Sequence, residues 1–222
     1  MPRTRVKICG VCRPEDAAAA VRHGADAVGM VRVRERERYV SIADAKAIAA
    51  ELPAFVMPVL LYVDPTPDEV IADLVQFGRS VVIQLNGGEP ISTLTALRGV
   101  TVITAVRVDE QIHDRLDVLR EANLPNLGGI ILETPGQMGG SGVANDWKTV
   151  AALQAKGAFD SLPPLIAAGG LGPLSVGQVI RDIKPFAVDV SSGVDETKRQ
   201  KSEKKIAAFI EAVRQADSAK EK

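Results

Sequence analysis

The feature that most constrains the fold is a regular alternation of short apolar segments with longer segments of helical period. The short segments are rich in Val, Ile and Leu, as expected of parallel strands that are covered on both faces. Eight of them follow one another, at residues 5–9, 27–31, 55–63, 81–85, 101–106, 129–133, 164–169 and 187–191. This alternation predicts repeated strand–helix units around a parallel sheet.

The number of units favours a closed sheet. Eight units in 222 residues suit an α/β fold of the (β/α)8 barrel type, which we predict as a single domain over residues 1–222. An open doubly wound sheet is the alternative, because periodicity does not show that the first strand pairs with the eighth. The charged end, residues 216–222, is expected to fray.

Composition excludes several classes of partner. With 27 basic and 28 acidic residues, the chain has no overall charge that would attract nucleic acid or an anionic membrane. No segment reaches the roughly 18 consecutive apolar residues of a membrane span, and the first residues do not resemble a signal peptide. We therefore expect a soluble, cytoplasmic protein that binds neither nucleic acid nor membrane.

Both cysteines lie in one short segment, KICGVC, as Cys9 and Cys12. Structural disulfides are uncommon in a reducing cytoplasm, and neither His23 nor His113 has a spacing that would complete a metal site. Cys9 ends the first predicted strand, whereas Cys12 falls in the following loop or first helical turn. We predict different surroundings for the two thiols, and no metal or cofactor.

The carboxyl ends of the strands are where a barrel of this kind carries its active site. Cys9 ends the first predicted strand and Glu133 the sixth, and these two groups could form an acid–base pair that moves a proton between neighbouring atoms. The helix that follows Cys9 is expected to lower the pKa of its thiol. A buried, inert cysteine is the alternative interpretation.

Glycine-rich turns follow the last two predicted strands, as AGGLGP at 168–173 and SSGVDE at 191–196. Turns at these strands often bind phosphate through backbone N–H groups, so the pattern favours a small phosphorylated substrate. The alternative is that these glycines only allow tight turns. The segment GQMGGSG, residues 136–142, is either a loop that covers bound ligand or a simple connector.

Seven segments together resemble the phosphoribosylanthranilate isomerase family. They are KICG, GADAVGM, RYVS, QLNG, GGSGVANDW, AAGGL and DVSSGVDE, and they extend from about residue 5 to residue 210. The resemblance implies a (β/α)8 enzyme of tryptophan biosynthesis. It also implies a cofactor-free Amadori rearrangement of N-(5-phosphoribosyl)anthranilate, carried out by a monomer or homodimer.

The resemblance further implies roles for particular residues. Cys9 corresponds to the base that takes the proton from C2 of the ring-opened sugar, and Glu133 to the acid that protonates the ring oxygen. Arg38 corresponds to the arginine that faces the anthranilate carboxylate, and Asp189 is expected near the sugar hydroxyls. The implied phosphate-binding residues are Gly169, Gly170, Ser192 and Gly193.

Three positions depart from the family pattern. Glu133 replaces an aspartate, and a displacement of about 1 Å in an active site can cost on the order of 10²-fold in rate. Asn86, which we expect to contact substrate, replaces a histidine, and Arg36 and Glu37 replace a Ser-Pro pair. These changes leave two alternatives open: an isomerase of another aminosugar phosphate, and a non-catalytic protein that binds a phosphorylated metabolite.

Overall fold

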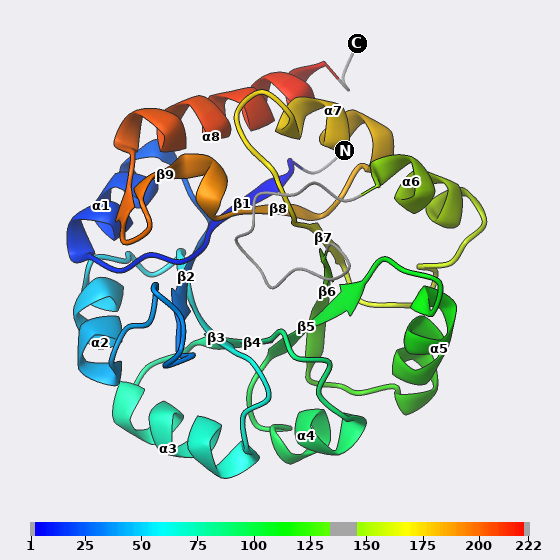
Figure 1. The fold of residues 1–222 in the computed structure, drawn as a ribbon, viewed down its shortest axis with the longest axis horizontal. Coiled ribbons are helices and arrows are strands. Elements are labelled where there is room, and N and C mark those ends of the chain that lie inside the picture. The colour runs from blue at the N-terminus through cyan, green and yellow to red at the C-terminus, as the bar shows by residue number, and fades with distance from the viewer. Residues whose placement is uncertain (1–2, 134–145, 220–222) are drawn as a thin grey trace.

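The computed structural model describes residues 3–133 and 146–219. Eight parallel strands close into a barrel, in which each strand pairs with the next in sequence and β8 pairs with β1 (Figure 1). The strands are β1 (Arg5–Ile8), β2 (Ala27–Val31), β3 (Met57–Tyr62), β4 (Val82–Leu85), β5 (Val102–Arg107), β6 (Leu127–Glu133), β7 (Leu165–Ala167) and β8 (Ala187–Val190). Closure confirms the predicted barrel and excludes the open sheet.

Helices surround the barrel as an outer ring (Figure 1). They are α1 (Pro14–His23), α2 (Ile42–Ala50), α3 (Pro67–Phe77), α4 (Ile91–Ala96), α5 (Ile112–Ala122), α6 (Trp147–Ala155), α7 (Val176–Ile183) and α8 (Glu203–Ser218). Local sequence explains several starts: α1 and α3 have proline in the first turn, and Ser41 and Thr66 form capping boxes that satisfy the free N–H groups of α2 and α3.

A short insertion lies between β8 and α8. It consists of the 3-10 helix η1 (Ser192–Val194) and a hairpin of β9 (Asp195–Thr197) and β10 (Gln200–Lys201). The hairpin lies beside α1, where the backbone N–H of Lys201 donates to the Asp16 carboxylate at 3.1 Å (Figure 1). The insertion therefore brings residues from the end of the chain next to the exit of β1.

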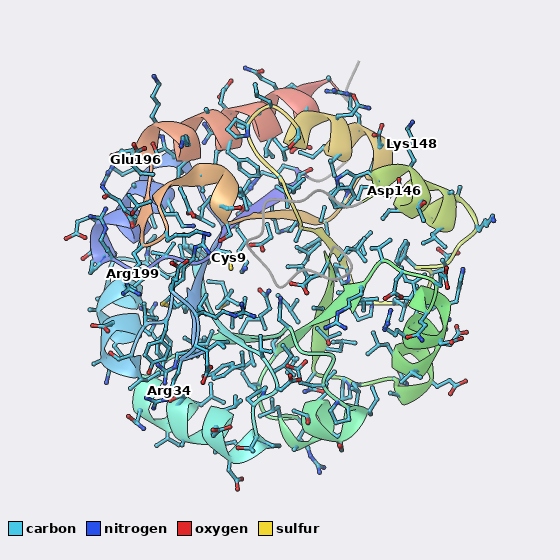
Figure 2. The ribbon with its side chains drawn as sticks, in the orientation of Figure 1. Cys9, Arg34, Asp146, Lys148, Glu196 and Arg199 are labelled. Carbon is cyan, nitrogen blue, oxygen red and sulfur yellow. The ribbon has the colours of Figure 1, made fainter. Side chains whose placement is uncertain are left out.

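Side chains of β1 alternate between two surroundings, as strand geometry requires. Val6 and Ile8 pack in the large apolar cluster between barrel and helices, whereas Lys7 is buried outside that cluster. Cys9, two residues after Lys7, projects toward the middle of the ring of helices (Figure 2). The same alternation that builds the core thus directs polar groups toward the barrel axis.

The expected fraying of the C-terminus is wrong for residues 216–218. Helix α8 continues to Ser218, Ala216 is buried, and the Asp217 carboxylate accepts hydrogen bonds from the Thr4 backbone N–H and hydroxyl, each at 2.7 Å. The prediction failed because it considered only the polar composition of this segment, which does not indicate its contact with Thr4 at the start of the chain. Within the described ranges, no helix combines the length and apolar character needed to cross a membrane.

Candidate active site

Three candidate residues lie buried at the carboxyl ends of the strands. Cys9 directly follows β1, where its backbone N–H donates to the Val190 carbonyl of β8 at 2.8 Å, and Glu133 is the last residue of β6. Asp189 lies in β8, and its charge acts on both Cys9 and Glu133. The structure therefore brings the predicted thiol and carboxyl groups to the same mouth of the barrel.

The immediate neighbour of Cys9 is Lys7, a residue that sequence reasoning missed. Lys7 Nζ donates to Asp189 Oδ1 at 2.7 Å, and the side chains of this ion pair are only 6% and 9% exposed. Burial opposes the charged form of Lys7, but the charges of Asp189 and Cys9 outweigh it and raise the lysine pKa. Lys7 therefore remains a buried ammonium beside the thiol.

Burial raises the pKa of the Cys9 thiol, and the nearby Lys7 ammonium partly offsets this effect. The prediction that the following helix lowers this pKa is wrong. Cys9 is only 5% exposed and α1 begins only at Pro14, so loss of hydration exceeds any effect of the helix dipole. A positive partner, rather than a helix end, is what favours the thiolate here.

Gly29 of β2 makes room for this pair of side chains. A Cβ atom at Gly29 would lie 2.9 Å from Cys9 Sγ and 3.1 Å from Lys7 Nζ, so a larger residue would displace them.

Cys12, by contrast, lies in the loop and its thiol contacts the carbonyl oxygens of Gly10 at 3.6 Å and Arg38 at 3.5 Å. Both thiols are free, and they have the different surroundings that we predicted.

Two amide side chains, of Gln84 in β4 and Asn86 just after it, form a hydrogen-bonded series that ends at Glu133. Asn86 Nδ2 donates to Glu133 Oε1, while Asn86 Oδ1 accepts from Gln84 Nε2 at 2.8 Å. Burial and the Asp189 charge raise the pKa of Glu133 to about 7. A carboxyl group with this pKa is substantially protonated near neutral pH, so it can donate a proton, as a general acid must.

Arg38 lies on the loop after β2, where its guanidinium pairs with the Asp195 carboxylate. Asp195 also accepts from Lys201 Nζ at 2.6 Å, and Lys201 Nζ in turn reaches the Ser191 carbonyl at 3.1 Å. Arg38 Nε is buried without a hydrogen-bond partner among the described residues. Two positive groups thus share one carboxylate, which leaves positive charge available for an anionic ligand.

The two glycine-rich turns meet at the mouth of the barrel. Gly169 and Gly170 have positive φ angles of 92° and 62°, and a side chain at Gly193 would collide with the Leu171 carbonyl. In the part of the chain described, four N–H groups of these turns donate no hydrogen bond, those of Gly169, Gly170, Ser192 and Gly193. Unused backbone donors at two adjacent turns are suited to the oxygens of a phosphate.

The sequence singles out two further segments. Glu37, in the charged loop after β2, is exposed, and its carboxylate lies 3.9 Å from Lys198 Nζ, so its charge is solvated. Residues 136–142, predicted to cover ligand or simply connect elements, lie outside the described residues. Among the described residues, no group of three or more His, Cys, Asp or Glu side chains could hold a metal ion.

Comparison with known proteins adds to this geometry. The family model described as N-(5'-phosphoribosyl)anthranilate (PRA) isomerase matches residues 6–212. The chain belongs to this family. A PRA isomerase of Pseudomonas putida is 40% identical over 225 residues, which cover 97% of this chain and 100% of the relative. That of Pseudomonas aeruginosa (strain UCBPP-PA14) is 39% identical over 223 residues, covering 96% and 97%.

Solved structures of PRA isomerases share the barrel. The structure of the Thermotoga maritima enzyme has a TM-score of 0.82 and 34% sequence identity, and covers 96% of this chain and 99% of its own. Another PRA isomerase structure, with a TM-score of 0.80, 34% identity and the same coverage, is a complex with reduced 1-(o-carboxyphenylamino)-1-deoxyribulose 5-phosphate. These comparisons confirm the family inferred from the sequence segments.

The residues that sequence reasoning missed are Lys7, Gln84, Asp195 and Lys201. A signal existed for two of them, since Lys7 and Gln84 are polar residues inside otherwise apolar strands and lie two positions before Cys9 and Asn86. Asp195 lies in the turn SSGVDE, but its pairing could not be predicted, because its partner Arg38 is 157 positions away in the sequence.

Proposed function

We propose that the protein converts N-(5'-phosphoribosyl)anthranilate to 1-(2-carboxyphenylamino)-1-deoxyribulose 5-phosphate, without a cofactor. The observation that carries this proposal is Glu133: a carboxyl group with a pKa of about 7 that faces the same barrel mouth as the Cys9 thiol. Family membership supports the assignment. An acid and a base at one mouth are what an isomerisation by proton transfer requires.

In the first step, protonated Glu133 donates its proton to the furanose ring oxygen. The bond between C1 and that oxygen breaks, and the nitrogen lone pair forms a C1=N double bond. Burial suits Glu133 to this step, because it keeps the carboxyl group protonated to a higher pH than an exposed one.

In the second step, the Cys9 thiolate takes the proton from C2. The electrons of the C–H bond form a C1=C2 double bond, and the π electrons of the C1=N bond return to nitrogen. The resulting enol amine becomes the ketone when C1 gains a proton and the C2 hydroxyl loses one. Transfer of a proton from Cys9 to Glu133 then restores the starting state. Lys7 supports this step because its ammonium group stabilises the thiolate.

Binding is assigned to groups around the two reacting residues. Arg38 offers a guanidinium whose Nε is unpaired among the described residues, suited to the planar carboxylate of the anthranilate ring. Asp189 pairs with Lys7 beside the reacting residues, where its carboxylate can accept hydrogen bonds from sugar hydroxyls. The turns around Gly169, Gly170, Ser192 and Gly193 offer the N–H groups for the phosphate.

The principal test is an assay of purified protein with N-(5'-phosphoribosyl)anthranilate, followed by the loss of anthranilate-type fluorescence. We expect turnover by the wild type, loss of at least about 10³-fold in Cys9→Ala, and near-normal turnover in Cys12→Ser. Cys12 is a matched control because it is the only other cysteine of the chain. Undiminished turnover in Cys9→Ala would remove Cys9 from the mechanism.

The two alternative functions have a separate test. The altered residue Glu37 is exposed and lies 3.9 Å from Lys198 Nζ, so it gives no support to a change of substrate. We expect the gene to rescue a tryptophan auxotroph that lacks the isomerase. Failure with good expression would favour another aminosugar phosphate, and binding of a reduced product analogue without turnover would favour a non-catalytic protein.

We further infer that the protein acts in the cytoplasm as a monomer or homodimer. A phosphoribosylanthranilate isomerase of Thermotoga maritima, 33% identical to this chain, is dimeric, and its structure has been solved in the form of monomers. Light scattering of the purified protein across a concentration series distinguishes the two states.

A further inference from the structure

Two of the three departures from the family pattern contact each other. Asn86 follows β4 and Glu133 ends β6, and the Asn86 amide donates directly to the Glu133 carboxylate. Both backbones are fixed by the sheet: the Asn86 N–H donates to the Tyr62 carbonyl at 3.0 Å, and the Glu133 carbonyl accepts from Val108 N–H at 3.1 Å. The lengths of the two side chains therefore determine whether they meet.

Gln84 fixes the orientation of the Asn86 amide. It lies two residues before Asn86 and is 1% exposed, and its Nε2 donates to Asn86 Oδ1 at 2.8 Å. Because this oxygen is already engaged, the NH₂ group of Asn86 is the end that faces Glu133. Gln84 is thus a positioning residue that acts on the acid through Asn86.

The contact also determines which oxygen of Glu133 carries its proton. Oε1 accepts from Asn86, whereas Oε2 has no hydrogen-bond partner within residues 3–133 and 146–219. A protonated carboxyl group has a single O–H, and an oxygen that already accepts an N–H is the less favourable place for it. The proton is therefore on Oε2, where none of the described protein groups holds it.

We propose that Asn86 and Glu133 form a matched pair, in which a shorter amide compensates for a longer acid and presents Oε2 to the substrate. Glutamate extends about 1.5 Å further than aspartate, by one carbon–carbon bond. Because the two side chains already touch, the larger imidazole of histidine would displace Glu133, while an aspartate would fall short of Asn86. The inference rests on the proposed function, since it assigns the acid of that reaction.

A double-mutant cycle tests the pairing. We expect Glu133→Asp and Asn86→His each to lower kcat by about 10- to 10²-fold, and the double variant to be more active than either single variant. A double variant whose loss equals the product of the two single losses would show that the residues act independently and would overturn the proposal. Wild-type turnover in the same assay reports on the proposed function itself.

A second measurement does not depend on turnover. Titration of the Glu133 carboxyl carbon by NMR is expected to give a higher pKa in Asn86→Leu than in wild type, because a donor to the charged form has been removed. Gln84→Met should shift the pKa in the same direction by less. Gln178→Met is the matched control, an exposed glutamine of α7 that pairs only with neighbours on its own helix among the described residues. An unchanged Glu133 pKa in both Asn86→Leu and Gln84→Met would overturn the positioning role.

Discussion

Glu133, which we propose as the acid of the reaction, is a residue at which folding and the proposed catalysis have opposite requirements. Burial makes its ionised form costly, yet the same burial keeps a proton available near neutral pH. The Asn86 amide donates to one oxygen of the Glu133 carboxylate, which lowers the free-energy cost of ionising Glu133 without abolishing it. Functional residues are often kept at such a cost to stability.

Stability therefore depends on pH at Glu133. Its pKa rises from 4.5 to about 7 on folding, so its favourable contribution is complete below pH 4.5 and is lost as the pH rises through 7. We expect Glu133→Gln to raise the free energy of unfolding by about 3 kcal/mol at pH 8 and to change it little at pH 4. Urea unfolding at both pH values measures this difference. An equal effect at both would show that ionisation of Glu133 is not the cause.

The pH dependence of turnover follows from two groups with opposite requirements. In the proposed reaction Glu133 must be protonated and Cys9 ionised, although the pKa of Glu133, about 7, is the lower of the two. The fraction of enzyme in this state rises with pH up to about 7, stays constant, and falls once the pH exceeds the thiol pKa. We expect kcat/KM to follow this profile. A maximum confined to pH values below 7 would contradict these assignments.

At the scale of elements, the apolar segments predicted the strands closely. Strand β2 has the predicted bounds. Strand β3 lacks Phe55, Val56 and Val63 of the predicted segment, because only Met57–Tyr62 pairs with adjacent strands. The local apolar pattern is sufficient to predict a strand where the buried residues are also the ones that pair with adjacent strands. The pKa of Cys9 and the pairing of Arg38 with Asp195 depend on distant segments, so they could not be predicted locally.

The contact between the turns after β7 and β8 gives a prediction about binding. Gly193→Ala would force a Cβ against the Leu171 carbonyl and separate the two turns. We expect KM to rise by about 10-fold or more while kcat changes less, since phosphate is bound equally in ground and transition states. Gly172→Ala is the control, because a Cβ there has no described neighbour within 4 Å. Equal KM values for both variants would place phosphate elsewhere.

At the scale of the whole molecule, the two ends of the described chain are joined by hydrogen bonds. Thr4 is 3% exposed, and its N–H and hydroxyl both donate to Asp217 near the end of α8. We expect Asp217→Ala to lower the free energy of unfolding by about 1 to 3 kcal/mol, because it removes an acceptor from buried donors. Chemical denaturation measures this loss, and Asp182→Ala on the exposed face of α7 serves as the comparison. Equal stabilities would show that the contact contributes nothing.

Closure of the barrel also has a consequence for the time at which the protein becomes active. Lys7 and Asp189, which pair across the seam between β1 and β8, are 182 positions apart in the sequence. At a synthesis rate of about 5–20 residues per second, the first strand waits on the order of 10 to 40 seconds on the ribosome for the eighth. During this interval Asp189, the counter-ion of Lys7, has not yet been made. The turns that we assign to phosphate are also missing. The surroundings of Cys9, which we propose as the base, are therefore completed only after the eighth strand has been made, although Cys9 itself is among the first residues made.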